Sequence, residues 1–315
     1  MEKPEIKAEI NNKLEALQKN LSETGARTVL TSLAHILAFP PEFLEPNREL
    51  YVKSIKSFLN FGNSHLYMNI IHSLYPNYVR NSYDFYVPII RELITNYNNF
   101  NKRLNPSELV NILTKFSECN TRNPTIYNHI LSDIGRLFNA LKNDELSDVV
   151  VAFTKIRIKQ TDLFDKILSK IVSYPTNFAT NIKFIFSSFF KVGFNSPQAK
   201  ASIAEIYKKS GKSSATALAF ANYISILNIE NEAELFEEVL ANLTPEFSQR
   251  YKHDLFNLEE YLRIVHKDKP HFAETVKNLI PEYEELKAKI STESKTLSKA
   301  KKLVRKNYLI LEFIF

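Results

Sequence analysis

The sequence predicts an all-α protein, an α-solenoid of about seven helix-hairpin repeats of 36–41 residues. Three observations predict it: a marker that recurs along the chain, apolar residues at helical spacing in both halves of each repeat, and prolines between the halves. Only five glycines occur among the 315 residues. This scarcity disfavours folds that depend on tight turns.

The recurring marker is a pair of residues, usually an apolar residue followed by an aromatic one. Successive pairs are 35, 41, 37, 72 and 36 residues apart, at Leu50-Tyr51, Phe85-Tyr86, Ile126-Tyr127, Leu163-Phe164, Leu235-Phe236 and His271-Phe272. The gap of 72 residues contains a degenerate copy at Ala199-Lys200. A helix pair of this length cannot bury its own apolar stripe, so the repetition predicts stacked neighbours that cover one another.

Each repeat contains two amphipathic helices. Residues 107–134 overlay residues 144–171 with a shift of 37, and the apolar positions coincide in both halves. In the first half, the spacing i, i+3, i+4, i+7 forms one stripe, which ends at Phe116 in the first copy and at Phe153 in the second. We interpret these residues as packing surface between helices.

Prolines divide the chain at the same places. Proline is excluded from helix interiors and concentrates at boundaries and first turns. One set falls between the two helices of a repeat, at Pro76, Pro124, Pro197 and Pro270; a second falls between repeats, at Pro106, Pro175, Pro245 and Pro281.

Two segments flank the repeats, so we expect three parts: a capping helix in 1–26, the repeat array in 27–290, and a basic helix with an apolar tail in 291–315. The first part has a heptad-like apolar stripe. The last contains the basic string KAKKLVRK and ends in YLILEFIF, an apolar run that needs a cover.

Composition sets limits on the function. The 41 basic and 35 acidic side chains give a net charge of +6, which is compatible with a polyanionic partner without requiring one. We expect no membrane span, because no apolar run reaches 18 residues. The first ten residues resemble neither a mitochondrial presequence nor a secretory signal, so either the chain has no cleaved address or the sequence begins after it.

Motifs for catalysis are weak, and we expect neither an enzyme nor a cofactor, metal or small-molecule substrate. The string SGKSS at 210–214 lacks the first glycine of a phosphate loop, which would fall at Ile206. The seven histidines have no metal-binding spacing. Cys119 is the only cysteine, so no disulfide framework exists. Carboxylate pairs such as Glu237-Glu238 and Glu259-Glu260 are expected on solvent faces of helices.

The string ELVNILTKFSECNTRNPTIYNHILSDI resembles the helix pairs of octotricopeptide and heptatricopeptide repeats and of FAST-kinase-type and RAP proteins of organelles. The matching positions are Leu109, Asn111, Leu113, Phe116, Asn123-Pro124 and Ile126-Tyr127. The tryptophan frequent in that family falls at Thr114 and Val151 here, and no RAP domain is seen after residue 290. The resemblance implies a protein of the mitochondrial matrix that binds RNA.

Candidate RNA-binding residues lie on the expected exposed face of the first helices and in the basic tail. They are Asn69, His72, Asn111, Lys115, Asp148, Lys155, Lys191, Arg263, Lys299, Lys301, Lys302, Arg305 and Lys306. Lys115, Lys155 and Lys191 recur at intervals of 40 and 36 residues, which predicts a ladder of positive charge for phosphates.

Two functions remain open. In the first, the chain binds ribosomal or other organellar RNA as a mitochondrial ribosome component or as an RNA-processing or translation factor, with other proteins of a large assembly as partners. In the second, it is a protein-binding α-solenoid scaffold of a large mitochondrial complex.

Overall fold

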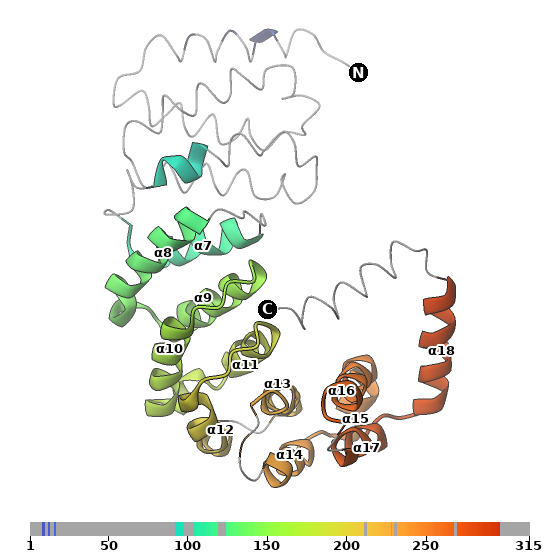
Figure 1. Ribbon diagram of the computed structural model, residues 1–315. Coiled ribbons are helices and arrows are strands. Elements are labelled where there is room, and N and C mark those ends of the chain that lie inside the picture. The colour runs from blue at the N-terminus through green and yellow to red at the C-terminus, as the bar shows by residue number, and fades with distance from the viewer. Residues whose placement is uncertain are drawn as a thin grey trace. The chain divides into compact units, whose positions relative to one another are not determined.

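The computed structural model describes residues 92–97, 104–118, 124–210, 213–227, 229, 232–267 and 270–296, together with residues 8, 9, 12 and 16 near the N-terminus. Every regular element in these ranges is a helix, and they contain no strand. The all-α prediction is therefore confirmed (Figure 1). The four N-terminal residues fall in the expected capping helix, and Ala8, Glu9, Asn12 and Ala16 are helical; the marker pairs before residue 92 and Cys119 lie outside the described residues.

The helices have the following bounds. In chain order they are α7 (Pro106–Glu118), α8 (Pro124–Leu137), the short 3₁₀ helix η4 (Phe138–Ala140), α9 (Asn143–Lys155), α10 (Thr161–Ser173), η5 (Pro175–Phe178), α11 (Ile182–Lys191), α12 (Pro197–Lys209), α13 (Ser214–Ile224), α14 (Glu232–Leu240), α15 (Pro245–Arg250), α16 (Lys252–Val265), α17 (Pro270–Asn278) and α18 (Tyr283–Thr296).

The chain forms two compact units, Met1–Glu145 and Leu146–Phe315, and the boundary falls inside α9. In the second unit, helices alternate between two layers (Figure 1). The first helices of successive repeats, α9, α11, α13 and α16, form an inner layer, and the second helices, α10, α12, α14 and α17, form an outer layer on the convex side. This is the predicted solenoid of helix pairs.

Prolines and hydroxyl caps fix where the helices begin. Proline is the first residue of six of the described helices, namely α7, α8, η5, α12, α15 and α17. Ser196 caps α12 by accepting a hydrogen bond from the Ala199 amide, and Ser213 caps α13 by accepting one from the Thr216 amide. Ser213 belongs to the SGKSS string, so the part of that string that the structure describes includes a helix cap.

A carboxylate cap recurs at the first helices of two consecutive repeats, and at α7 it is reciprocal. Before α7, the Asn105 side chain accepts from the Glu108 amide, and the Glu108 carboxylate accepts from the Asn105 amide. One repeat later, the Glu145 carboxylate accepts from the Lys142 amide at 2.8 Å. Glu145 also accepts from the hydroxyl of Ser107, so this cap ties the start of α9 to the start of α7.

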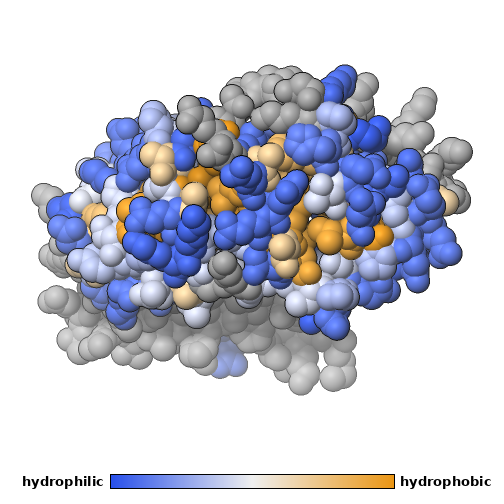
Figure 2. Space-filling model, turned by 90° about the horizontal axis from the view of Figure 1, so that it is seen from below, coloured by the Kyte–Doolittle hydropathy of each residue, from blue (hydrophilic) through white to orange (hydrophobic). Residues whose placement is uncertain are grey.

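The predicted apolar stripes form the core. Phe116, Phe153, Phe189 and Tyr223 occupy equivalent positions in four successive first helices, and each side chain is buried. The stripes of the second helices are buried in the same way, with Ile126 to Ile134 in α8 and Leu163 to Ile171 in α10, although Leu131 is only half-buried. Figure 2 shows one face of the molecule, on which hydrophilic residues surround smaller hydrophobic areas.

The helix α13 is buried on nearly all sides. Its ring Phe220 lies 4.4 Å from Phe186 of α11 and 5.0 Å from Tyr207 of α12, measured between ring centroids. Within the inner layer, the ring centroids of Phe190 in α11 and Tyr261 in α16 lie 5.5 Å apart. Because its neighbours close around it, α13 consists mainly of small and apolar residues, ATALAFANYI after its first serine.

One carboxylate expected in solvent is buried. Glu259 is 3% exposed, whereas Glu237 is exposed and Glu238 and Glu260 are half-buried. The solvent-face prediction was therefore wrong for Glu259. The reason is a residue from a later helix: the hydroxyl of Tyr283 in α18 donates a hydrogen bond to Glu259 at 3.0 Å.

Candidate RNA-binding edge

The structure describes six of the thirteen candidate residues. Asn111 and Lys115 lie in α7, Asp148 and Lys155 in α9, Lys191 in α11 and Arg263 in α16. The other seven lie outside the described residues: Asn69, His72, Lys299, Lys301, Lys302, Arg305 and Lys306.

Lys155 and Lys191 occupy the same position in consecutive repeats. Each is the last residue of its helix and is exposed, and each follows two residues after a buried phenylalanine, Phe153 or Phe189. The hydroxyl of Thr154 lies 3.4 Å from the Ser188 carbonyl, so the C-terminal turns of α9 and α11 lie side by side. Positive charge at these positions also complements the helix dipoles.

Lys115 does not share that position. It precedes Phe116 by one residue, and the position equivalent to Lys155 in α7 is Glu118. Lys115 is half-buried, with 20% of its side chain exposed, and its ammonium lies 3.4 Å from the Glu118 carboxylate. The ladder is therefore regular at two of its three predicted members. Asn111 is half-buried and Asp148 is exposed, and these two residues occupy equivalent positions in α7 and α9.

The turn after each of these two helices has the same backbone. Arg157 has φ of 58°, and Gly193, one repeat later, has φ of 61°. In both turns the next residue donates its amide back to the buried phenylalanine, Ile158 to the Phe153 carbonyl at 3.0 Å and Phe194 to the Phe189 carbonyl at 2.9 Å. This is the Schellman arrangement, in which glycine usually takes the left-handed position.

These turns place four cationic side chains at one edge of the second unit. We name this set the basic edge and define it as Lys155, Arg157, Lys159 and Lys191, all of which are exposed. The ammonium of Lys159 donates to the carbonyl of Gly193 at 2.8 Å, which links the two turns. Periodicity found Lys155 and Lys191 but missed Arg157 and Lys159. The alternation KIRIK at 155–159 was the available signal.

Two acidic residues of α10, Asp162 and Asp165, follow Lys159 of the basic edge in the sequence. Asp165 of α10 accepts a hydrogen bond from the hydroxyl of Ser196 at 2.6 Å. Asp162 is exposed in the first turn of α10, where the helix dipole favours a carboxylate. The basic edge therefore has a net positive charge with an acidic boundary on the α10 side.

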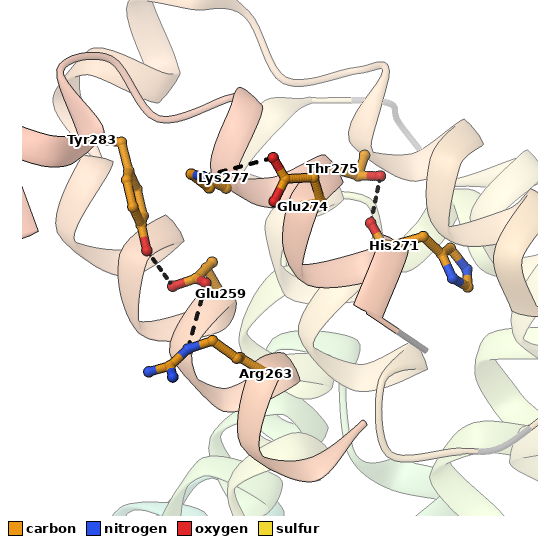
Figure 3. Close-up of polar contacts among 7 residues, drawn as sticks. All are labelled: Glu259, Arg263, His271, Glu274, Thr275, Lys277 and Tyr283. Atoms are coloured by element: carbon orange, nitrogen blue, oxygen red, sulfur yellow. Dashed lines mark hydrogen bonds and ion pairs between the residues drawn. The ribbon is translucent and has the colours of Figure 1, made fainter. Parts of the chain in front are cut away.

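Arg263 belongs to a different polar cluster, shown in Figure 3. Its Nε lies 3.8 Å from an oxygen of Glu259, and the hydroxyl of Tyr283 donates to the other carboxylate oxygen. Burial and the Glu259 carboxylate raise the pKa of Tyr283 to about 12. Arg263 is 61% exposed, so one side of its guanidinium neutralises a buried charge and the rest faces solvent.

The described residues contain neither a metal site nor a membrane span. No group of three His, Cys, Asp or Glu side chains there has the arrangement of a metal site. Among the helices that the structure describes, none has the length and apolar character needed to cross a membrane.

Comparison with known families gives one match. Residues 86–244 match the model of the family described as RNA-editing substrate-binding complex 6 protein, abbreviated RESC6. The chain belongs to the RESC6 family. The matched residues include the basic edge and the helices from α7 to α14. No curated protein showed significant similarity to the chain.

RESC6 membership confirms the coarse expectation of a helical repeat protein associated with RNA, and this family is mitochondrial. The family name also implies a large complex with RNA and protein partners. The match supports the resemblance to octotricopeptide and RAP proteins only at the level of a helical, RNA-associated repeat array. The match gives no support to a ribosomal role.

Proposed function

We propose that this chain is a non-enzymatic, RNA-contacting scaffold subunit of a mitochondrial RNA-editing substrate-binding complex. In this proposal, it holds RNA by the phosphate backbone along the basic edge. The family match supports an RNA-processing role over a role in the ribosome or in translation. The single observation that best supports contact with RNA is the left-handed backbone of Arg157, which lies between the exposed Lys155 and Lys159.

The left-handed backbone of Arg157 lowers the stability of the fold. A residue with a side chain loses roughly 1–2 kcal/mol in the left-handed region, and the next repeat uses Gly193 at the same position. The side chain of Arg157 is exposed, so it does not contribute to the core. Residues held in such backbone conformations are common at binding sites, which supports a role for this side chain in binding.

The geometry of the edge suits a phosphate chain. Lysine binds phosphate as a point charge, and the arginine fork binds it with two parallel hydrogen bonds. The two turns lie next to each other, linked by the Lys159–Gly193 hydrogen bond. A single strand of RNA that runs along the edge would therefore meet cations from two consecutive repeats. Contacts to phosphate give affinity without sequence information.

The alternative is a scaffold that binds only protein. The modest net charge of +6 favours this alternative, because many nucleic-acid-binding domains are more basic. The two functions differ in salt dependence. Each phosphate contact to single-stranded RNA adds about 0.7 to the slope of log affinity against log salt, because bound counterions are released.

The test measures binding of the full chain to a fluorescent single-stranded RNA across a salt series. The variant Lys155→Glu with Lys191→Glu should bind more weakly and show a shallower salt slope. A matched control changes Lys166 and Lys200, exposed lysines of the outer helices α10 and α12, to Glu. Equal losses in both variants would indicate a nonspecific charge effect, and a flat salt dependence of the unmodified chain would overturn RNA contact.

A further inference from the structure

The ring of Phe184 is an exposed aromatic surface on a helix whose other rings are mostly in the core. Phe184 is 50% exposed, whereas Phe186 and Phe189 of the same helix are fully buried. The core therefore does not account for an aromatic residue at position 184. The equivalent position one repeat earlier is the exposed Asp148, so the repeat pattern does not require an apolar residue there either.

The helix that carries Phe184 is basic. The ammonium of Lys183 lies 4.8 Å from the centroid of its ring, a cation–π distance. Lys191 of the basic edge follows seven residues later, two helical turns along the same face of α11. The sequence of α11, IKFIFSSFFK, contains no acidic residue. Figure 1 places α11 in the inner layer, between α9 and α13.

We propose that Phe184 stacks on an unpaired nucleobase of RNA whose phosphates contact Lys191 and the basic edge. This inference rests on the proposed function and specifies its substrate class as single-stranded RNA. Every base has a flat π face, so aromatic stacking binds single strands with little sequence preference. In a duplex the bases already stack on one another and are not available to a side chain.

Charge favours RNA over an apolar protein surface as the occupant. A protein that covered Phe184 with apolar side chains would also desolvate the ammonium of Lys183, which is unfavourable without a paired anion. A nucleotide provides both a π face for the ring and a phosphate for the lysines. The combination of one exposed ring and two nearby cations therefore fits a nucleotide.

The sequence contains no tryptophan, so Phe184→Trp introduces a single tryptophan at the proposed stacking position, and its emission can be excited selectively over that of the 15 tyrosines. Stacking of a base on the indole should quench its emission as single-stranded RNA is added. A strand of the same length with abasic nucleotides should bind through its phosphates with little quenching, and a duplex should quench less than the single strand. The matched control is Ala201→Trp, at an exposed position of the outer helix α12.

The outcomes separate the two proposals. Quenching at position 184 by the single strand but not by the abasic strand supports stacking. If RNA binds and remains sensitive to Lys155→Glu with Lys191→Glu, but emission at position 184 is unchanged or follows that at position 201, stacking is overturned and the proposed function stands. Absence of any RNA binding overturns both. A change of emission only when a partner protein is added also overturns stacking.

Discussion

Arg157 and Gly193 occupy the same position in consecutive repeats and share a left-handed backbone, with φ of 58° and 61°. Both end a helix of the inner layer through the same pair of backbone hydrogen bonds. The fold therefore requires this conformation, and glycine meets the requirement with less strain. An arginine at this position is consistent with the proposed role of its side chain in binding RNA.

Replacing Arg157 with Gly should separate stability from binding. Glycine relieves the left-handed strain but makes the unfolded chain more flexible, so the free energy of unfolding should rise by up to about 1 kcal/mol. Affinity for single-stranded RNA should fall at the same time, with a shallower salt slope, because one cation is lost. Urea denaturation and a binding titration measure the two effects.

The control for this variant is Arg157→Lys, which keeps the charge and the strained backbone. It should retain more RNA affinity than Arg157→Gly and gain no stability. If Arg157→Gly bound RNA as well as the unmodified chain, Arg157 would have no part in binding.

Phe153→Ala should destabilise the protein strongly. Phe153 is fully buried in the stripe that recurs in the first helices. Removing a buried aromatic side chain costs about 3–5 kcal/mol through lost apolar contact and the cavity left behind. Denaturant unfolding measures this loss, and the exposed Phe184→Ala is the matched comparison, with a smaller expected loss. Equal effects of the two substitutions would contradict the assignment of the stripe to the core.

Tyr223→Phe should leave the protein at least as stable at neutral pH. The hydroxyl of Tyr223 is buried and has no hydrogen-bond partner among the described residues. Removing an unsatisfied buried polar group is nearly neutral or stabilising, by about 1 kcal/mol. Thermal unfolding at pH 7 measures this. A loss of more than about 2 kcal/mol, on the scale of a broken buried hydrogen bond, would show that the hydroxyl has a partner.

Alkaline pH should destabilise the fold through its buried tyrosines. Burial raises the pKa of Tyr207 to about 12 and is the main cause of the rise in the pKa of Tyr283 to about 12, both from 10.0. The folded state therefore binds these protons more tightly than the unfolded state, and stability is full below pH 10 and falls as pH rises towards 12. Unfolding curves at pH 9, 10 and 11 should show this decline. Tyr283→Phe should make stability fall less steeply with pH, whereas an unchanged slope would count against a raised pKa for Tyr283.

The contact between α16 and α18 should show coupling. Tyr283→Phe removes the hydrogen bond to Glu259 and leaves a buried carboxylate with fewer donors, so it should destabilise the protein by about 1–3 kcal/mol. Combining it with Glu259→Gln should cause less than the sum of the two separate losses, because both changes remove the same interaction. Additive losses in this double-mutant cycle would show that the two residues act independently.

Periodicity predicted most of the fold because it reports burial directly. The stripe that contains Phe116 and Phe153 recurs with a shift of 37 residues, and the structure buries both side chains. The same shift places Lys115 opposite Ala152 rather than Lys155, so the ladder spacing of 40 residues joined positions that differ by three residues, nearly one helical turn, in their repeats.

The features that the sequence did not predict depend on long-range contacts or backbone conformations, and neither leaves a periodic pattern in the sequence. Glu259 is buried by Tyr283, which lies 24 residues later in another helix. The left-handed conformation of Arg157 has no signature in its residue type, because arginine rarely adopts it. Only an alignment of consecutive repeats, which places Arg157 opposite Gly193, indicates that position 157 is left-handed.

The most direct measurement is ultraviolet crosslinking of RNA to the chain within its native complex, followed by identification of the crosslinked peptides. The account predicts crosslinks in the peptides that contain residues 155–159 and 184–193, and their loss in Lys155→Glu with Lys191→Glu. Crosslinks confined to the outer helices α12 and α14, or a complex in which this chain gives no crosslink to RNA, would contradict it.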